Sequence, residues 1–248
     1  PEVVASGVPS FKAYMTYDGR LADDDLLRAL KTLKEAGGLM TVHAENHVIV
    51  GALATELKQT APHRAASHAL SRPDYAEALA IETAIALAEA AGDAPLYIVH
   101  LSTAKGLEAI RRAKAEGRKV WAETCPQYLL LTDSCYDGEF EQALKYVMAP
   151  PPRKRQDVEA LWEGLFDGGI DTVATDHCSF AWQDKIRFAQ GNVFKCPGGI
   201  PGVETRLPLL YSEGVLKRGL DRKRFVDLVS TAPARLFGLA RKGGLKVG

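Results

Sequence analysis

The sequence lacks several features that mark particular classes of protein. Its four cysteines include no C-x-x-C pair, so we expect reduced thiols and a cytoplasmic location rather than a disulfide framework. No apolar run approaches the roughly 18 residues that a membrane span needs. The 31 basic and 31 acidic residues cancel to a formal charge of zero, without a basic stripe or a block of like charge. Membranes and nucleic acids are therefore not expected as partners.

Three common catalytic motifs are absent as well. The sequence contains no G-x-S-x-G nucleophile elbow, no Walker loop and no G-x-G-x-x-G after a strand. The segment 196–202 is rich in glycine and proline, but it follows no clear strand. We therefore predict that this segment is a substrate-contacting loop and not a phosphate cradle.

What the sequence does contain is a repeated alternation of short apolar runs and helical patterns. We predict five strands, which end near Tyr14, at His43, at His100 and at Thr124, with a fifth that contains Val173. Helices are predicted over residues 23–36, 73–91, 103–116, 156–166, 204–213 and 221–238. Strands that alternate with helices indicate parallel βαβ units and an α/β fold.

Five strands are fewer than the eight that close a (β/α)8 TIM barrel. An open parallel sheet of this kind would leave two edges with unpaired backbone groups. The chain also begins at Pro1, without an initiator methionine. We therefore expect the sequence to be part of a longer polypeptide.

Four residues of metal-ligand type stand at the carboxyl ends of apolar runs: Lys12, His43, His100 and Asp176. Because the carboxyl ends of barrel strands converge on one mouth, residues far apart in sequence would meet there in one pocket. Imidazole nitrogens and a carboxylate suit Zn²⁺ or a similar divalent ion. The pattern indicates a metal-dependent hydrolase.

Lys12 alone has three interpretations. It could be a structural lysine whose ammonium reaches solvent, or a Schiff-base lysine as in aldolases. It could also be a neutral amine that captures CO₂ and becomes an anionic carbamate, able to bridge two metal ions.

The remaining histidines carry weaker signals. His63 and His68 fall in a predicted loop that could approach the mouth, and His177 is expected only to support its neighbour Asp176.

Seven short motifs resemble the cyclic amidohydrolases, in particular the dihydropyrimidinase and D-hydantoinase branch. They are SFKAYMTY (10–17), VHAEN (42–46), HALSRP (68–73), VHLS (99–102), ETCPQYL (123–129), APPPR (149–153) and TDHC (175–178). They occur in the family's order and span nearly the whole chain. The resemblance implies a metal-dependent hydrolase of the TIM-barrel type, of which only about the fourth to eighth βα units are present. Residues 1–240 would be this partial barrel, and residues 241–248 would begin the connection to a C-terminal β-sandwich.

The resemblance also implies a role for each site residue. Lys12 would be the carboxylated lysine that bridges two divalent metal ions, most often Zn²⁺, with Mn²⁺, Co²⁺ or Fe²⁺ as alternatives. His43 and His100 would bind one metal, and Asp176 would bind the other and act as general base. Tyr17 would be the catalytic tyrosine that hydrogen-bonds the substrate's developing oxyanion.

Two positions differ from the family where the substrate binds. Ala149 stands where the family usually has serine, and Gly198 where it usually has asparagine; both would contact the substrate through backbone groups.

The family's first barrel strand carries a His-x-His pair that completes the second metal site, and this sequence contains no such pair. We therefore expect the chain alone to be inactive.

The implied reaction is hydrolysis of a cyclic amide, either a dihydropyrimidine or a 5-substituted hydantoin, to an N-carbamoyl amino acid. The implied partners are this small substrate and further copies of the protein, in a dimer or tetramer. Three alternatives stay open: a non-catalytic dihydropyrimidinase-like assembly protein, an allantoinase-type ureide hydrolase, and an aldolase that uses Lys12. The presence of Lys12, His43, His100 and Asp176 argues against the first.

Overall fold

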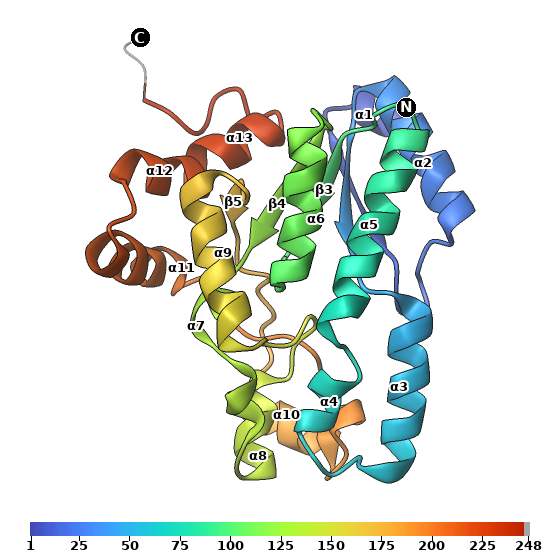
Figure 1. Ribbon diagram of the computed structural model, residues 1–248, viewed down its shortest axis with the longest axis vertical. Helices are drawn as coiled ribbons and strands as arrows, with labels where there is room; N and C mark the ends of the chain where they lie inside the picture. The colour runs from blue at the N-terminus through green and yellow to red at the C-terminus, as the bar shows by residue number, and fades with distance from the viewer. Residues whose placement is uncertain (246–248) are drawn as a thin grey trace.

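The computed structural model describes residues 1–245 and is built around one five-stranded parallel sheet (Figure 1). The strands are β1 (Ser10–Tyr14), β2 (Leu39–His43), β3 (Leu96–Ile98), β4 (Val120–Thr124) and β5 (Thr172–Val173). They pair in chain order, each parallel to the next. The predicted α/β fold with five parallel strands is confirmed. All five carboxyl ends therefore lie at the same edge of the sheet.

Helices connect the strands and extend the chain beyond them. They are α1 (Glu2–Ala5), α2 (Asp23–Ala36), α3 (His47–Thr60), α4 (Ala66–Leu70), α5 (Asp74–Ala90), α6 (Ala104–Ala115), α7 (Pro126–Leu130), α8 (Phe140–Ala143), α9 (Arg155–Asp167), α10 (Trp182–Ala189), α11 (Arg206–Leu209), α12 (Arg222–Val226) and α13 (Ala232–Leu236). Figure 1 shows α2, α5, α6 and α9 alongside the sheet, while α3, α4, α8 and α10 gather beyond one end of it. Within residues 1–245, no helix is both long enough and apolar enough to cross a membrane.

The sheet has two faces of different composition. Small and branched side chains such as Ala13, Val42 and Ile98 are buried on the outer face in one core with the flanking helices. The inner face carries Leu39 and Tyr97, which pack in a smaller cluster that also includes Trp121 and Phe237. Lys12, Thr41 and His43 lie on this same face, as the strand register shows. Polar side chains of this face can therefore form a site at the carboxyl edge of the sheet.

The local chemistry of α2 explains why its bounds match the prediction. Three aspartates occupy its first turn, where the helix dipole favours negative charge. Leu26, Leu30 and Leu33 recur at helical spacing and are buried. Gly37 ends the helix with a φ of 75°, a left-handed conformation that glycine adopts without steric cost.

Two predicted elements differ from the structure. The third strand ends at Ile98 and not at His100, because His100 has a φ of 41° and cannot continue a strand. His68 lies in α4 and not in a loop. The C-terminal third is helical as predicted, but it includes the wider π-type turns Leu210–Lys217 and Asp227–Thr231. The predicted connection over residues 241–248 falls partly outside the described residues.

Candidate active site

The structure places the four predicted ligands at the carboxyl edge of the sheet. Lys12 lies within β1, and His43 is the last residue of β2. His100 follows β3 by two residues, and Asp176 follows β5 by three. The charge of Asp176 acts on Lys12, and those of Lys12 and His43 act on Asp176 and on His100. Residues separated by up to 164 positions of sequence are thus brought together.

The two histidines face one another closely. Nδ1 of His43 lies 2.9 Å from Nε2 of His100, and the ring centroids are 4.6 Å apart. Nε2 of His43 lies 2.7 Å from a carboxylate oxygen of Glu45, which fixes the proton on Nε2. The lone pair of His43 Nδ1 is then directed toward His100. Two imidazole nitrogens that converge in this way, with a carboxylate behind one of them, fit the donor set of a single divalent ion.

Desolvation by the surrounding protein shifts the pKa of the other predicted ligands, completely for the buried His100 and partly for Lys12 and Asp176, whose side chains remain exposed. It lowers the pKa of His100 well below its usual value, so the imidazole is neutral, which is the form that binds metal. Burial also lowers the pKa of the Lys12 ammonium, although the charges of Asp176 and Glu123 oppose this effect. A lysine must be neutral to take up CO₂, so the lowered pKa favours that reaction. Burial raises the pKa of Asp176, and Lys12 and His43 oppose the rise.

A metal site cannot be built here from the usual residue types alone. Within residues 1–245, no three His, Cys, Asp or Glu side chains are grouped so that they could hold a metal ion. The donors at the edge of the sheet are two imidazoles, one carboxylate and one amine. Lys12 would become an anionic oxygen ligand only as a carbamate, and that modification would bring the set to four.

Tyr17 closes one side of the site. Its ring centroid lies 5.1 Å from that of His43, and the guanidinium of Arg72 lies 5.2 Å from the Tyr17 ring centroid. Burial raises the pKa of Tyr17 to about 12, with Arg72 opposing the rise. The phenol is therefore protonated at neutral pH and can donate a hydrogen bond, as the predicted oxyanion role requires.

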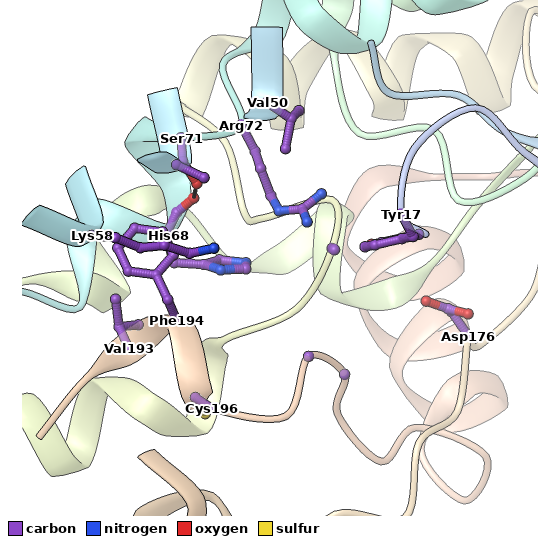
Figure 2. A pocket seen from close by; sticks show the side chains of 14 residues that line it. Tyr17, Val50, Lys58, His68, Ser71, Arg72, Asp176, Val193, Phe194 and Cys196 are labelled. Atoms are coloured by element: carbon purple, nitrogen blue, oxygen red, sulfur yellow. Dashed lines mark hydrogen bonds between the residues drawn. The ribbon is translucent and has the colours of Figure 1, made fainter. Parts of the chain in front are cut away.

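A cavity of about 360 Å³ extends from this edge of the sheet. Tyr17 and Asp176 stand at one end of it, and Lys58 and Phe194 stand at the other (Figure 2). Ala149 and Gly198, the two predicted substrate contacts, both line the cavity. Its size is within the range that small-molecule sites occupy.

Ala149 and Gly198 come from segments that a backbone hydrogen bond joins. The N–H of Gly199 donates to the carbonyl of Val147 at 3.0 Å. This bond fixes the loop 196–202 against the segment 146–150, so that both predicted contacts border the same cavity. The loop thus lines the cavity, and its contact with a substrate stays a prediction.

Two residues of the site, Glu45 and Arg72, were not predicted. Glu45 accepts from both His43 and Arg72, and Arg72 lines the cavity. Burial opposes ionisation of Glu45, but Arg72 and His43 hold its pKa well below the usual range. His68 also lines the cavity, whereas His63 is exposed outside it. Glu45 lies in the VHAEN motif, which was the one available signal for it.

Three of the predicted site residues have unusual backbone conformations. The φ angles of Tyr17, His100 and Asp176 are 74°, 41° and 47°. Residues other than glycine rarely adopt positive φ, and such strain concentrates at functional sites. Each of the three lies two or three residues past the end of a strand, namely β1, β3 or β5.

The chain is similar in sequence to known hydantoinases. No model of a protein family matches the chain. The D-phenylhydantoinase of Escherichia coli strain K12 is 46% identical over 245 residues, which are 99% of this chain and 53% of that protein. The chain is homologous to one half of a hydantoinase.

Solved structures extend the similarity to the fold. The dihydropyrimidinase from Brevibacillus agri NCHU1002 superposes with a TM-score of 0.95 at 37% identity, covering 99% of this chain and 54% of that one. The L-hydantoinase (dihydropyrimidinase) from Arthrobacter aurescens superposes with a TM-score of 0.91 at 33% identity, covering 100% of this chain and 55% of that one. The chain therefore spans about half the length of the relatives it matches. The predicted resemblance to this branch is confirmed, and the five-stranded parallel sheet matches solved structures of that branch, which is consistent with a partial TIM barrel.

Proposed function

We propose that this chain contributes five strands and most of the active site of a metal-dependent cyclic amidohydrolase. The substrate would be a dihydropyrimidine or a 5-substituted hydantoin, and the product an N-carbamoyl amino acid. The observation that carries the proposal is the meeting of Lys12, His43, His100 and Asp176 at one edge of the sheet, beside Tyr17. The similarity to a D-phenylhydantoinase and to a dihydropyrimidinase supports the reaction class.

The implied cofactor is a pair of divalent metal ions, with Zn²⁺ as the first choice. Lys12 as its carbamate, His43, His100 and Asp176 would hold them. Bound there, such ions make hydroxide available near neutral pH and polarise the substrate carbonyl. The chain's own contribution to this site is orientation, since Glu45 holds His43 in one tautomer through a 2.7 Å contact.

Tyr17 would stabilise the transition state directly. As the ring carbonyl is attacked, negative charge develops on its oxygen, and the protonated Tyr17 hydroxyl donates to that oxygen. Loss of one preorganised donor of this kind costs on the order of 3 kcal/mol. The Arg72 guanidinium lies 5.2 Å from the centroid of the Tyr17 ring and so contacts the ring that carries this hydroxyl.

Asp176 would move the proton. In the proposed reaction it accepts a proton from the nucleophile and passes it to the ring nitrogen as the amide bond breaks. Burial raises its pKa, which brings the carboxyl group closer to the neutral range in which a proton carrier works best. Ala149 and Gly198 would bind the ring through backbone groups, so the small side chains at these positions are compatible with binding.

The variant Lys12→Ala tests the proposal in the full-length protein. Without the amine no carbamate can form, so we expect loss of bound divalent ions and a fall in hydantoin hydrolysis by about three orders of magnitude, since the metals contribute several kcal/mol. Metal content by elemental analysis and turnover by product assay measure the two effects. Lys31→Ala, which changes an exposed lysine of α2, is the matched control. Near-normal hydrolysis by Lys12→Ala would rule out the carbamate.

A further inference from the structure

The segment 146–150 is held in place by buried side chains that bind its carbonyl oxygens. Four such hydrogen bonds occur along it: Tyr136 Oη to the carbonyl of Tyr146 at 2.9 Å, Lys185 Nζ to Val147 at 2.7 Å, His68 Nε2 to Met148 at 2.7 Å and Tyr128 Oη to Pro150 at 2.9 Å. Among the hydrogen bonds of residues 1–245, none reaches the carbonyl or the N–H of Ala149. Ala149 borders the cavity, so its two backbone groups are left for a ligand.

Lys185 is the least expected of these donors. Its side chain is almost completely buried, with 1% of its surface exposed. Its hydrogen bonds go to backbone carbonyls, those of Val147 at 2.7 Å and Lys145 at 3.4 Å, and within residues 1–245 it forms no ion pair. Burial lowers its pKa to about 8. Burying an ammonium without a carboxylate partner costs free energy. The cluster around Val147 is apolar, so an apolar side chain could pack there without this cost.

His68 acts on the peptide group that contains the Ala149 N–H. Burial lowers the pKa of His68 to about 4, so the ring is neutral at physiological pH. A carbonyl can only accept, so Nε2 carries the proton that is donated to Met148. The peptide unit between Met148 and Ala149 is planar and trans, and its C=O and N–H point in opposite directions. Fixing the oxygen therefore fixes the direction of the Ala149 N–H.

The same contact strengthens the Ala149 N–H as a donor. When a peptide carbonyl accepts a hydrogen bond, the N–H of the same unit is polarised and donates more strongly. His68 and Ala149 both line the cavity, and Figure 2 shows His68 across it from Tyr17 and Asp176. His68 is thus linked to a prospective ligand through the rigid peptide unit between Met148 and Ala149.

We propose that His68 and Lys185 are positioning residues, which hold the segment 146–150 so that the N–H and C=O of Ala149 bind the ring of the substrate. This inference rests on the proposed function and extends it to two residues outside the predicted ligand set. The matching ligand has a carbonyl acceptor and an N–H donor on its ring, as cyclic amides and ureides do. Neither His68 nor Lys185 touches the reacting atoms, so their effect is on binding.

The test compares His68→Leu with His68→Gln in the full-length, metal-loaded protein. Leucine removes the donor, whereas the glutamine amide can place a nitrogen where Nε2 was. We expect His68→Leu to raise the KM for dihydrouracil about tenfold with little change in kcat, as loss of one buried hydrogen bond implies, and His68→Gln to restore most of the difference. His63→Leu, at an exposed position outside the cavity, is the matched control and should keep the wild-type KM.

Lys185→Met supplies an independent variant, because methionine keeps much of the side-chain volume without the charge. It should raise KM in the same way. Calorimetric binding of dihydrouracil and thermal melting complete the measurement. A wild-type KM in both His68→Leu and Lys185→Met would overturn the inference, and so would equal losses in kcat, metal content and melting temperature without rescue by glutamine. A wild-type protein that binds dihydrouracil but does not hydrolyse it would contradict the proposed function while leaving this inference intact, provided that the variants bind more weakly.

Discussion

Glu77 is a buried carboxyl group whose protonation should change with pH although it takes no part in the proposed reaction. It lies in α5 and accepts from the backbone N–H of Ser102 at 3.0 Å and from the Ser102 hydroxyl at 3.0 Å and 3.1 Å. Burial raises its pKa to about 7, although the charge of Arg153 opposes the rise. Arg153 reaches the same Ser102 hydroxyl through Nε at 3.0 Å.

Replacement of Glu77 by glutamine should change how stability depends on pH. The folded-state pKa of about 7 lies above the ordinary glutamate value of 4.5, so the folded protein holds the proton more tightly than the unfolded chain does. The contribution of Glu77 to the free energy of unfolding is therefore greatest below about pH 4.5. It falls as pH rises to about 7, by on the order of 1 kcal/mol per pH unit. Urea unfolding of Glu77→Gln between pH 5 and pH 7 should lack this slope.

Glu77→Ala should behave differently from Glu77→Gln, because it leaves the Ser102 N–H buried without an acceptor. Relative to Glu77→Gln, we expect it to lower the free energy of unfolding by about 1–3 kcal/mol at every pH, since neither variant titrates at this position. Glu82→Gln, on the exposed side of the same helix, is the control. An unchanged pH slope in Glu77→Gln would show that the group is not titrating in this range.

The residues that sequence could reveal differ from those it could not. Lys12, His43, His100 and Asp176 stand at the ends of apolar runs, so their position follows from the parallel-sheet pattern. The role of His68 could not be predicted in this way, because it depends on a contact with Met148, 80 residues further along the chain. Side-chain to backbone contacts of this kind have no signature in local sequence.

Among the elements, the contact between α6 and α9 depends on a glycine. A Cβ built on Gly164 would lie 2.8 Å from Cδ2 of Leu107 and 3.0 Å from Cδ1 of Ile170. Leu107 and Ile170 are fully buried, so little room exists for them to move. The two helices therefore approach closely only because no side chain stands at this position.

Gly164→Ala should lower stability despite the better helix propensity of alanine. We expect a loss of about 1–3 kcal/mol from overpacking, measured as a shift in the denaturation midpoint. Gly51→Ala in α3 is a matched control, since nothing lies within 4 Å of the added Cβ. The control should be neutral or stabilising by up to about 1 kcal/mol. Equal effects of the two substitutions would show that packing at Gly164 is not limiting.

Element boundaries were predictable where local chemistry decides them. The acidic first turn and Gly37 define α2 from within its own sequence. The end of β3 was not predictable, because the apolar run continues to Val99 while His100 turns into the left-handed region for the sake of the site. Tertiary requirements override the local pattern at that point.

For the whole molecule, the proposed metal site joins distant parts of the chain. Its ligands come from β1, β2 and the segments after β3 and β5, which span most of the sheet. A ligand that binds only the folded state stabilises it, by about 2.7 kcal/mol when its concentration is one hundred times the dissociation constant. The five parallel strands were predictable from the alternation of strands and helices, whereas the pairing of His43 with His100 followed only from the resemblance to a known family.

Removal of metal should therefore lower the melting temperature of the full-length protein. We expect a chelator to shift the thermal transition downward by several degrees, and added Zn²⁺ to restore it. Lys12→Ala should melt at the same temperature with and without chelator, because its site cannot form. A wild-type transition that ignores both chelator and Zn²⁺ would argue against the proposed site.

The positive φ angles at Tyr17, His100 and Asp176 have a practical consequence for protein engineering. Each such conformation costs about 1–3 kcal/mol for a residue with a side chain, and glycine or asparagine would relieve it. A directed-evolution screen that selects only for thermal stability would therefore select substitutions at these three positions first. The variants that it recovers would be stable but inactive. Libraries built on this scaffold should keep all three codons fixed and seek stability elsewhere.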